Sequence, residues 1–209
     1  LEAVRQALAG EATTTGAGTT ARAATTTFVT GCAANLNADQ FTGDGVTVVG
    51  RSADRAAAEI TEILGTAPRL ACHDDDRVAG RTRAFLKVQN GCDQRCAFCI
   101  IPRTRGVAES RSLDAVLRDA RRRIAEGHPE LVLTGINIGT WRADDGSDLA
   151  DLIHAVGSLA GLARLRISSI EPGNVNERLV AAMAETPVMA RHMHIPLQSG
   201  DPTVLVDMR

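Results

Sequence analysis

The chain of 209 residues has no run of about 18 apolar residues, and no basic stretch followed by an apolar segment opens it. The first absence predicts that nothing spans a bilayer, and the second predicts that there is no secretion signal. Hydrophobic residues still make up 44% of the chain, which is enough for a buried core. We therefore expect a globular, cytoplasmic protein with no membrane partner.

An excess of either charge is also missing, because 23 Lys and Arg stand against 25 Asp and Glu. A protein without net positive charge has no general attraction to nucleic acid, so contact with RNA needs a local basic patch. The run RDARRR at residues 118–123 offers four arginines, but most such helical faces are solvated. The run Asp74–Asp76 is likewise better explained as a solvated linker than as a metal site.

The first third of the chain has the pattern of a small α/β unit. A helix is expected at residues 2–9, followed by a biased, threonine-rich segment without confident structure. Strands are predicted in 25–32 and 44–51, and a helix from Ser52 to Gly65, with serine as N-cap and glycine as stop. We expect a first domain over residues 1–70 and a linker over residues 71–82.

From residue 83 onward, strands and helices alternate. The strands are predicted at 84–91, 130–137, 164–172 and 191–200, and the helices between them at 112–127, 147–162 and 176–186. This order predicts an α/β fold with a parallel sheet built of right-handed βαβ units. An open doubly wound sheet and an incomplete (β/α) barrel both remain compatible with it.

Polar residues lie where each of these strands ends. They are the loop after the first strand, Thr134–Asn137, Ser168–Glu171 and Gln198–Gly200. Since functional groups of parallel sheets gather at the carboxyl ends of the strands, we expect one crevice to collect all four segments.

Three of the five cysteines fall within NGCDQRCAFCIIP, residues 90–102. A clustered, odd number of cysteines favours a ligand role in a reducing compartment over a disulfide framework. Structural zinc needs four ligands, and no histidine near this loop completes the set. A thioredoxin-type pair of Cys96 and Cys99 leaves Cys92 unexplained. A ferredoxin pattern fails because Cys99 is followed by two isoleucines before Pro102.

The remaining interpretation is a cubane iron–sulfur cluster held by Cys92, Cys96 and Cys99, with the fourth iron open to a ligand. The spacing CxxxCxxC, with Phe98 before the last cysteine, resembles the signature of the radical S-adenosylmethionine (SAM) superfamily. This resemblance implies a 4Fe–4S cluster whose open iron binds SAM, and reductive cleavage of SAM. Arg95, Arg103 and Arg105 flank the loop and would raise the cluster's reduction potential if they lie close to it.

Longer blocks resemble the tRNA methylthiotransferases within that superfamily, over about residues 28–209. These blocks are VTGCAANL, CAFCIIPRTRG, ELVLTGINIGTW, RLRISSIEP and HMHIPLQSGDPTVLVDMR. LTGINIG and RISSIEP are closest to the branch acting on N6-threonylcarbamoyladenosine. The resemblance implies addition of a methylthio group to C2 of that adenosine, next to the anticodon of tRNA. The alternatives are the isopentenyladenosine branch, another radical SAM enzyme, or an inactive metal-binding remnant.

The resemblance also implies roles for single residues, an incomplete radical SAM barrel over residues 83–209, and part of a methylthiotransferase N-terminal domain before it. Cys32 matches one of three ligands of a second 4Fe–4S cluster, so we expect an internal piece of a longer protein. The implied partners are tRNA and an electron donor such as flavodoxin or ferredoxin. The implied cofactor-binding residues are Thr134 and Gly135 (the methionine amino group), Ser169 and Glu171 (the ribose or the reaction centre), Gln198 and Phe98.

Three further side chains have two explanations each. His192 and His194 alternate on the fourth predicted strand and are expected to be structural rather than acid–base groups. Trp141, the single tryptophan, is expected to pack in the core rather than to stack on a base.

Overall fold

The computed structural model describes residues 27–41, 43, 45–50, 53–65 and 82–209. The chain divides into two units, one that ends at Pro68 and one that begins at Arg69. The helix predicted at residues 2–9, the threonine-rich segment up to residue 26, Ser52, Cys72 and Asp74–Asp76 lie outside the described residues.

The first unit contains a small parallel sheet. Strand β1 (Thr27–Val29) pairs with β2 (Val46–Val48), and each lies within one of the two predicted strand ranges. Two short helical elements, α2 (Cys32–Leu36) and η1 (Ala38–Phe41), connect these strands, and α3 (Ala53–Leu64) follows β2. Gly50 after β2 donates its backbone N–H to Glu59 Oε2 of α3 at 2.7 Å, which ties the helix to the end of the strand.

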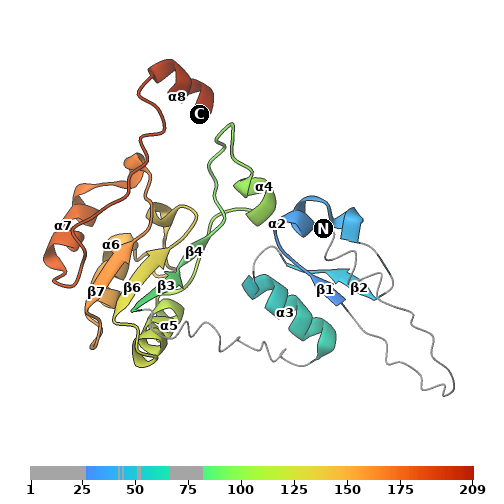
Figure 1. Ribbon diagram of the computed structural model, residues 1–209, viewed down its shortest axis with the longest axis horizontal. Coiled ribbons are helices and arrows are strands. Elements are labelled where there is room, and N and C mark those ends of the chain that lie inside the picture. The colour runs from blue at the N-terminus through green and yellow to red at the C-terminus, as the bar shows by residue number, and fades with distance from the viewer. Residues whose placement is uncertain (1–26, 42, 44, 51–52, 66–81) are drawn as a thin grey trace. The chain divides into compact units, whose positions relative to one another are not determined.

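The second unit is built on a parallel sheet in the order β3–β6–β7, which confirms the predicted α/β class with parallel strands. Its strands are β3 (Arg83–Lys87), β6 (Glu130–Thr134) and β7 (Arg164–Ile167). The predicted helices are present as α5 (Leu113–Ala125), α6 (Leu149–Gly157) and α7 (Glu177–Glu185) (Figure 1). A short antiparallel pair, β4 (Gln89–Asn90) with β5 (Glu109–Ser110), extends beyond β3.

Shorter helical elements complete the second unit. They are α4 (Ile101–Arg105), η3 (Ile138–Thr140), η4 (Pro172–Asn174) and α8 (Pro202–Met208). Side chains cap the helices as the sequence suggests: Ser112 Oγ accepts from Ala115 N, and the Asn176 side chain accepts from Leu179 N. Asp148 and Asp151 form a reciprocal capping box at α6.

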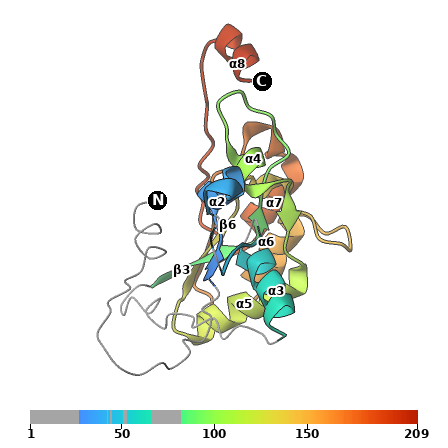
Figure 2. The same cartoon turned by 90° about the vertical axis from the view of Figure 1, so that its right-hand side faces the viewer.

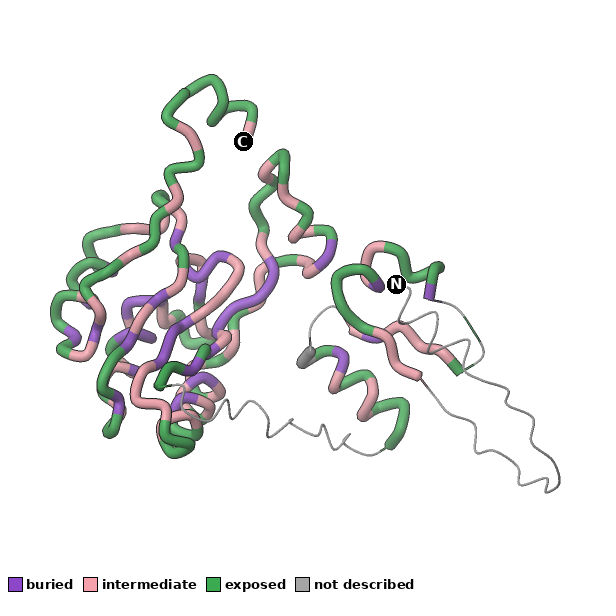
Figure 3. The backbone as a smooth tube through the Cα atoms, in the orientation of Figure 1, coloured by how far each residue is buried: buried purple, intermediate pink, exposed green. Residues whose placement is uncertain are grey.

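The hydrophobic core lies between one face of the sheet and the helices (Figures 2 and 3). Alternate residues of each strand point into this layer, as the period of two requires. On the opposite face Phe85 is 62% exposed. Buried core residues include Ala84 and Leu86 of β3, Leu131 and Leu133 of β6, Leu165 and Ile167 of β7, Val116 and Ala120 of α5, and Leu152, Ile153 and Val156 of α6.

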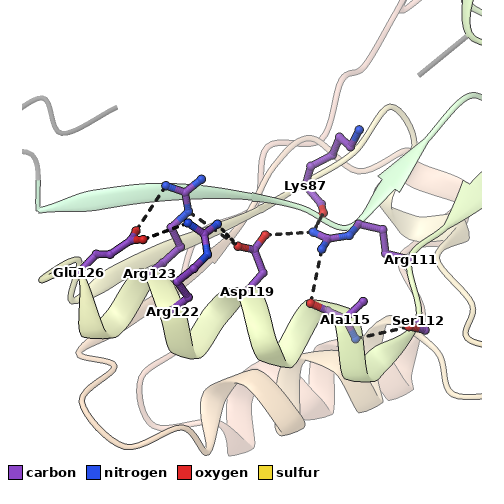
Figure 4. Close-up of polar contacts among 8 residues, drawn as sticks. All are labelled: Lys87, Arg111, Ser112, Ala115, Asp119, Arg122, Arg123 and Glu126. Carbon is purple, nitrogen blue, oxygen red and sulfur yellow. Dashed lines mark hydrogen bonds and ion pairs between the residues drawn. The ribbon is translucent and has the colours of Figure 1, made fainter. Parts of the chain in front are cut away.

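Arg111 connects the end of β3 to α5, as Figure 4 shows. Its Nη1 donates to the Lys87 carbonyl at 2.8 Å and to Asp119 Oδ2 at 3.1 Å, and its Nη2 donates to the Ala115 carbonyl at 3.4 Å. The backbone oxygen of Arg111 accepts from Trp141 Nε1 at 3.1 Å, and Trp141 is completely buried. Packing in the core is therefore confirmed for this tryptophan.

Part of the arginine run on α5 is neutralised within the helix. Arg122 and Arg123 both lie beside Asp119 and Glu126, at N–O distances between 2.5 and 3.9 Å (Figure 4). Burial acts to raise the pKa of Asp119, but hydrogen bonds from Arg122 and Arg111 outweigh it and hold that pKa below its ordinary value. Only Arg118 and Arg121 of the run remain as exposed cations without an ion pair in the described part of the chain.

The prediction of a fourth strand over residues 191–200 is wrong, because the structure has no strand there. The chain meets β7 at one isolated bridge, between Leu165 and Met189, and His194 accepts one further backbone bond from Ile170 at 3.0 Å. Pro196 has no N–H for a ladder, and Gln198 has a φ of 63°, so extended pairing does not continue. The prediction that His192 and His194 share one side of a strand is therefore wrong as well.

No helix in the described part of the chain has the length and apolar character needed to cross a membrane.

Candidate functional site

The cysteine loop, residues 91–100, begins at a glycine that no other residue can replace without strain. Gly91 is buried with a φ of 68°, and a Cβ there would lie 1.9 Å from the Val107 carbonyl oxygen. The close approach lets Cys92 N donate to the Gly106 carbonyl at 3.1 Å. The loop then leads into α4, whose Pro102 occupies the first turn, where proline is tolerated.

The three cysteines of this loop line a single cavity of about 540 Å³. Residues from the other strand ends complete it: Ile136 and Asn137 follow β6, and Glu171 follows β7. The predicted crevice at the carboxyl ends of the strands is thus present as a cavity. Its remaining lining residues are Gln94, Phe98, Gly173, Asn174, Gln198, Leu205, Met208 and Arg209.

The donor set of this cavity fits an iron–sulfur cluster. Cys92, Cys96 and Cys99 are free thiols and each is half-buried, so they are sheltered but reachable from the cavity. Over the described ranges, no three His, Cys, Asp or Glu side chains are grouped closely enough to hold one metal ion. A cubane cluster binds each thiolate to a different iron, so it does not require the three sulfur atoms to meet at one point.

Three of the predicted cofactor-binding residues line this cavity, and three do not. Phe98, Glu171 and Gln198 are among the lining residues. Thr134 and Gly135 lie just before the lining residue Ile136, and Ser169 lies two residues before Glu171. Cys32 is exposed and belongs to the first unit.

Ser169 and His194 form a pair at the end of β7. The Ser169 hydroxyl and His194 Nδ1 are 2.8 Å apart, and both residues are exposed. Arg105, by contrast, is half-buried and donates to Asn90 Oδ1 at 3.3 Å, next to the start of the cysteine loop. Arg95 and Arg103 are exposed.

Sequence reasoning placed Asn137 in the strand-end crevice without assigning it a role, and it missed Asn174. Asn137 and Asn174 come from the loops after β6 and β7, and Asn174 Nδ2 donates to Asn137 Oδ1 at 3.0 Å. Asn137 is 4% exposed. The signal available was their position, since polar residues at the ends of parallel strands are candidates for ligand contacts. The contribution of α8, through Leu205 and Met208, had no comparable signal.

The model of the Radical SAM superfamily matches residues 86–209. The tRNA-2-methylthio-N(6)-dimethylallyladenosine synthase of Acidithiobacillus ferrooxidans is 38% identical over 126 residues, which are 58% of this chain and 28% of that protein. The threonylcarbamoyladenosine tRNA methylthiotransferase MtaB of Bacillus subtilis is 40% identical over 131 residues, which are 62% of this chain and 29% of that protein. These relatives confirm the predicted resemblance to the tRNA methylthiotransferases.

The chain spans less than a third of the length of these curated relatives. Among solved structures, the radical SAM methyltransferase TsrM from Kitasatospora setae, with cobalamin and a [4Fe-4S] cluster bound, gives a TM-score of 0.49 at 18% identity. That match covers 58% of this chain and 23% of TsrM. Since the family model covers more than half of the chain and includes the whole cysteine loop, the chain belongs to the radical SAM superfamily.

Proposed function

We propose that the second unit is the cofactor-binding part of a methylthiotransferase that acts on tRNA. The observation that carries this proposal is the convergence of Cys92, Cys96 and Cys99 on one cavity with the strand-end residues of β6 and β7. Three thiolates are the protein ligands of a 4Fe–4S cluster with one open iron. When bound, the cluster and SAM supply a one-electron reductive cleavage that gives access to radical chemistry.

The residues of this chain then bind and orient the cofactors. The three thiolates hold the cluster, while Glu171 and Gln198, which line the same cavity, present polar groups to SAM. The Gln198 backbone lies in the left-handed region, with a φ of 63°, and such backbone strain in a non-glycine residue is concentrated at functional sites. We assign Phe98, 63% exposed, to apolar contact with the bound cofactor or substrate.

The other resemblance-derived roles are part of the same proposal. Thr134 and Gly135 precede the lining residue Ile136, which supports a role next to the methionine amino group. Ser169, near Glu171, is assigned to the ribose or the reaction centre. Cys32 is assigned to a second 4Fe–4S cluster, whose other ligands the resemblance places elsewhere in the N-terminal domain.

For the substrate we propose N6-threonylcarbamoyladenosine next to the anticodon of tRNA, modified at C2. The motifs LTGINIG and RISSIEP support this choice, as does the similarity to MtaB. The similarity to the dimethylallyladenosine synthase favours isopentenyladenosine as the second candidate. The reaction requires an electron donor such as flavodoxin or ferredoxin. Because its proposed substrate is tRNA, we assign the protein to the cytoplasm.

The first experiment is anaerobic reconstitution of the 209-residue chain with iron and sulfide, followed by metal analysis and electron paramagnetic resonance (EPR) of the reduced protein with and without SAM. We expect about four irons per chain and a spectrum that SAM changes. Cys92→Ala, Cys96→Ala and Cys99→Ala should each lose the signal, while Cys72→Ala, at the one cysteine with no assigned role, serves as the matched control and should retain it. Little iron, or a spectrum indifferent to SAM, would contradict the proposal.

The substrate is tested on the full-length protein. The reduced, reconstituted enzyme is incubated with tRNA carrying N6-threonylcarbamoyladenosine and, separately, with tRNA carrying isopentenyladenosine. Mass spectrometry of the digested nucleosides then shows which adenosine gains the methylthio group. Methylthiolation of the isopentenyladenosine tRNA alone would replace the first candidate by the second.

A further inference from the structure

Gln89 lies between β3 and the cysteine loop, and its side-chain amide uses all of its hydrogen-bonding capacity. The residue is 1% exposed. Its Oε1 accepts from the backbone N–H groups of Ile136 at 2.8 Å and Asn137 at 3.0 Å. Its Nε2 donates to the carbonyl oxygens of Asn90 at 3.0 Å and Gly91 at 2.8 Å. Because all four partners are backbone groups, they fix which end of the amide is oxygen and which is nitrogen.

These four bonds join the two loops that carry the site. Gly91 directly precedes Cys92, while Ile136 and Asn137 belong to the loop after β6 and line the same cavity as Cys92. The β3–β6 ladder ends where Lys87 pairs with Thr134, and Val88 N donates to the Thr134 carbonyl at 2.8 Å. Beyond that point the Gln89 side chain takes the place of backbone rungs between the two segments.

Gly135 lies directly against the Gln89 side chain, and the lack of a Cβ makes this contact possible. A Cβ at position 135 would lie 2.9 Å from Gln89 Oε1 and 3.0 Å from Gln89 Cβ, so the Gln89 side chain or the segment after β6 would have to shift. Glycine therefore lets the β6 segment approach the amide closely. This is a reason for a glycine at position 135 that is independent of any contact with cofactor.

Asn137 is the residue through which this connection reaches the cavity. Its backbone N–H donates to Gln89 Oε1 and its side-chain Oδ1 accepts from Asn174, so both the backbone and the side-chain oxygen of Asn137 are held in place. Its Nδ2 is buried and has no hydrogen-bond partner among the described residues. A buried amide group left unpaired in a cavity wall is costly unless a ligand or water satisfies it.

We propose that Gln89 is a positioning residue that fixes Asn137 relative to Cys92, so that the cluster and SAM are held in one geometry. The proposal rests on the function proposed above. Its physical basis is that a cofactor chelated to one wall of the cavity and hydrogen-bonded to the other is sensitive to their separation. Displacement of a binding group by about 1 Å can reduce a rate a hundredfold.

The test compares Gln89→Met with wild type in the full reconstituted chain. Methionine has a similar volume but makes none of the four bonds, so it leaves the two loops unlinked. We expect near-normal iron content, because the three thiols are unchanged. We expect the SAM concentration that half-converts the EPR spectrum to rise about tenfold or more.

Thr186→Val is the matched control for a general loss of stability. Thr186 is 5% exposed, its hydroxyl donates to the Ala182 carbonyl at 2.7 Å, and it does not line the cavity. This variant also loses a buried hydrogen bond but should titrate with SAM like wild type. An equal shift in both variants, or no shift in Gln89→Met, would overturn the proposal.

Gly135→Ala provides a second route if Gln89→Met does not fold. It keeps every hydrogen-bonding group, but the added Cβ would lie 2.9 Å from Gln89 Oε1, so we expect the amide and the segment after β6 to shift apart. We expect the same weakened response to SAM with iron retained, and a normal response would refute the role of Gln89. A wild-type chain that gains about four irons but ignores SAM would instead overturn the proposed function, and this proposal with it.

Discussion

Glu130 joins three neighbouring strands, and its substitution tests how far this contact stabilises the second unit. Glu130 Oε1 accepts from Arg166 Nε of β7 at 2.6 Å and from Arg83 Nε of β3 at 2.8 Å. The Glu130 side chain is 13% exposed, against 28% for Arg166 and 49% for Arg83. Burial acts to raise the pKa of Glu130, but the hydrogen bonds from Arg166 and Arg83 outweigh it and hold that pKa below its ordinary value of 4.5.

The expected loss for Glu130→Gln follows from these exposures. A sheltered hydrogen bond to a charged group contributes about 1.5–3 kcal/mol, and an exposed ion pair about 0.2–1 kcal/mol. The bond from the partly sheltered Arg166 should contribute at the lower end of the range for a sheltered charged hydrogen bond, and the bond from Arg83 should contribute as an exposed ion pair. We therefore expect the free energy of unfolding to fall by about 2 kcal/mol near neutral pH.

The pH dependence has a definite sign. A carboxyl group with a lowered pKa in the folded state contributes its full stabilisation above its ordinary pKa and loses it as the pH falls through the folded value. The difference between wild type and Glu130→Gln should therefore be largest near neutral pH and shrink below pH 4.5. Urea denaturation is followed by the fluorescence of Trp141, the single tryptophan, which is fully buried in the second unit.

Glu126→Gln is the control, because Glu126 also contacts two arginines, Arg122 and Arg123, but is 40% exposed on one helix. Its cost should stay within about 0.5 kcal/mol. Equal costs for the two variants, or a cost for Glu130→Gln that does not change in acid, would refute the reasoning.

Two further predictions concern the site and the helices. Gly91→Ala should reduce the iron retained after reconstitution severalfold, because its Cβ would lie only 1.9 Å from the Val107 carbonyl oxygen. Gly146→Ala is the control, because Gly146 also has a positive φ but a Cβ there meets no other atom within 4 Å. Asp148→Ala should lower the free energy of unfolding by about 1–2 kcal/mol through loss of the α6 cap. Burial acts to raise the pKa of Asp148, but backbone hydrogen bonds from Asp151 and Ala150 outweigh it and hold that pKa below its ordinary value of 3.8. The stability lost in Asp148→Ala should therefore shrink below pH 3.8. Urea denaturation measures this loss, and a loss that is undiminished in acid would contradict the prediction.

The cysteine loop and most secondary structure could be predicted because their signals are local. Ser112 marks a helix start through a hydrogen bond to a backbone N–H three residues later, and Gly65 marks a helix end through its positive φ of 66°. The spacing of Cys92, Cys96 and Cys99, on which the resemblance to the radical SAM signature rests, is likewise contained within eight residues. The prediction of the fourth strand failed because alternation of apolar residues cannot show whether a neighbouring strand is free to pair. Here β7 makes one isolated bridge with the following segment.

The sequence by itself thus determined the alternation of strands and helices, the three-thiol loop and the resemblance to a family. Only the tertiary structure decided which side chains meet across the cavity. Gln89 and Ile136 are 47 positions apart, and Asn137 and Asn174 are 37 apart, so no periodicity or spacing links them. Their contacts depend on the register of β3 against β6 and on the loops beyond it, which packing of the whole sheet fixes.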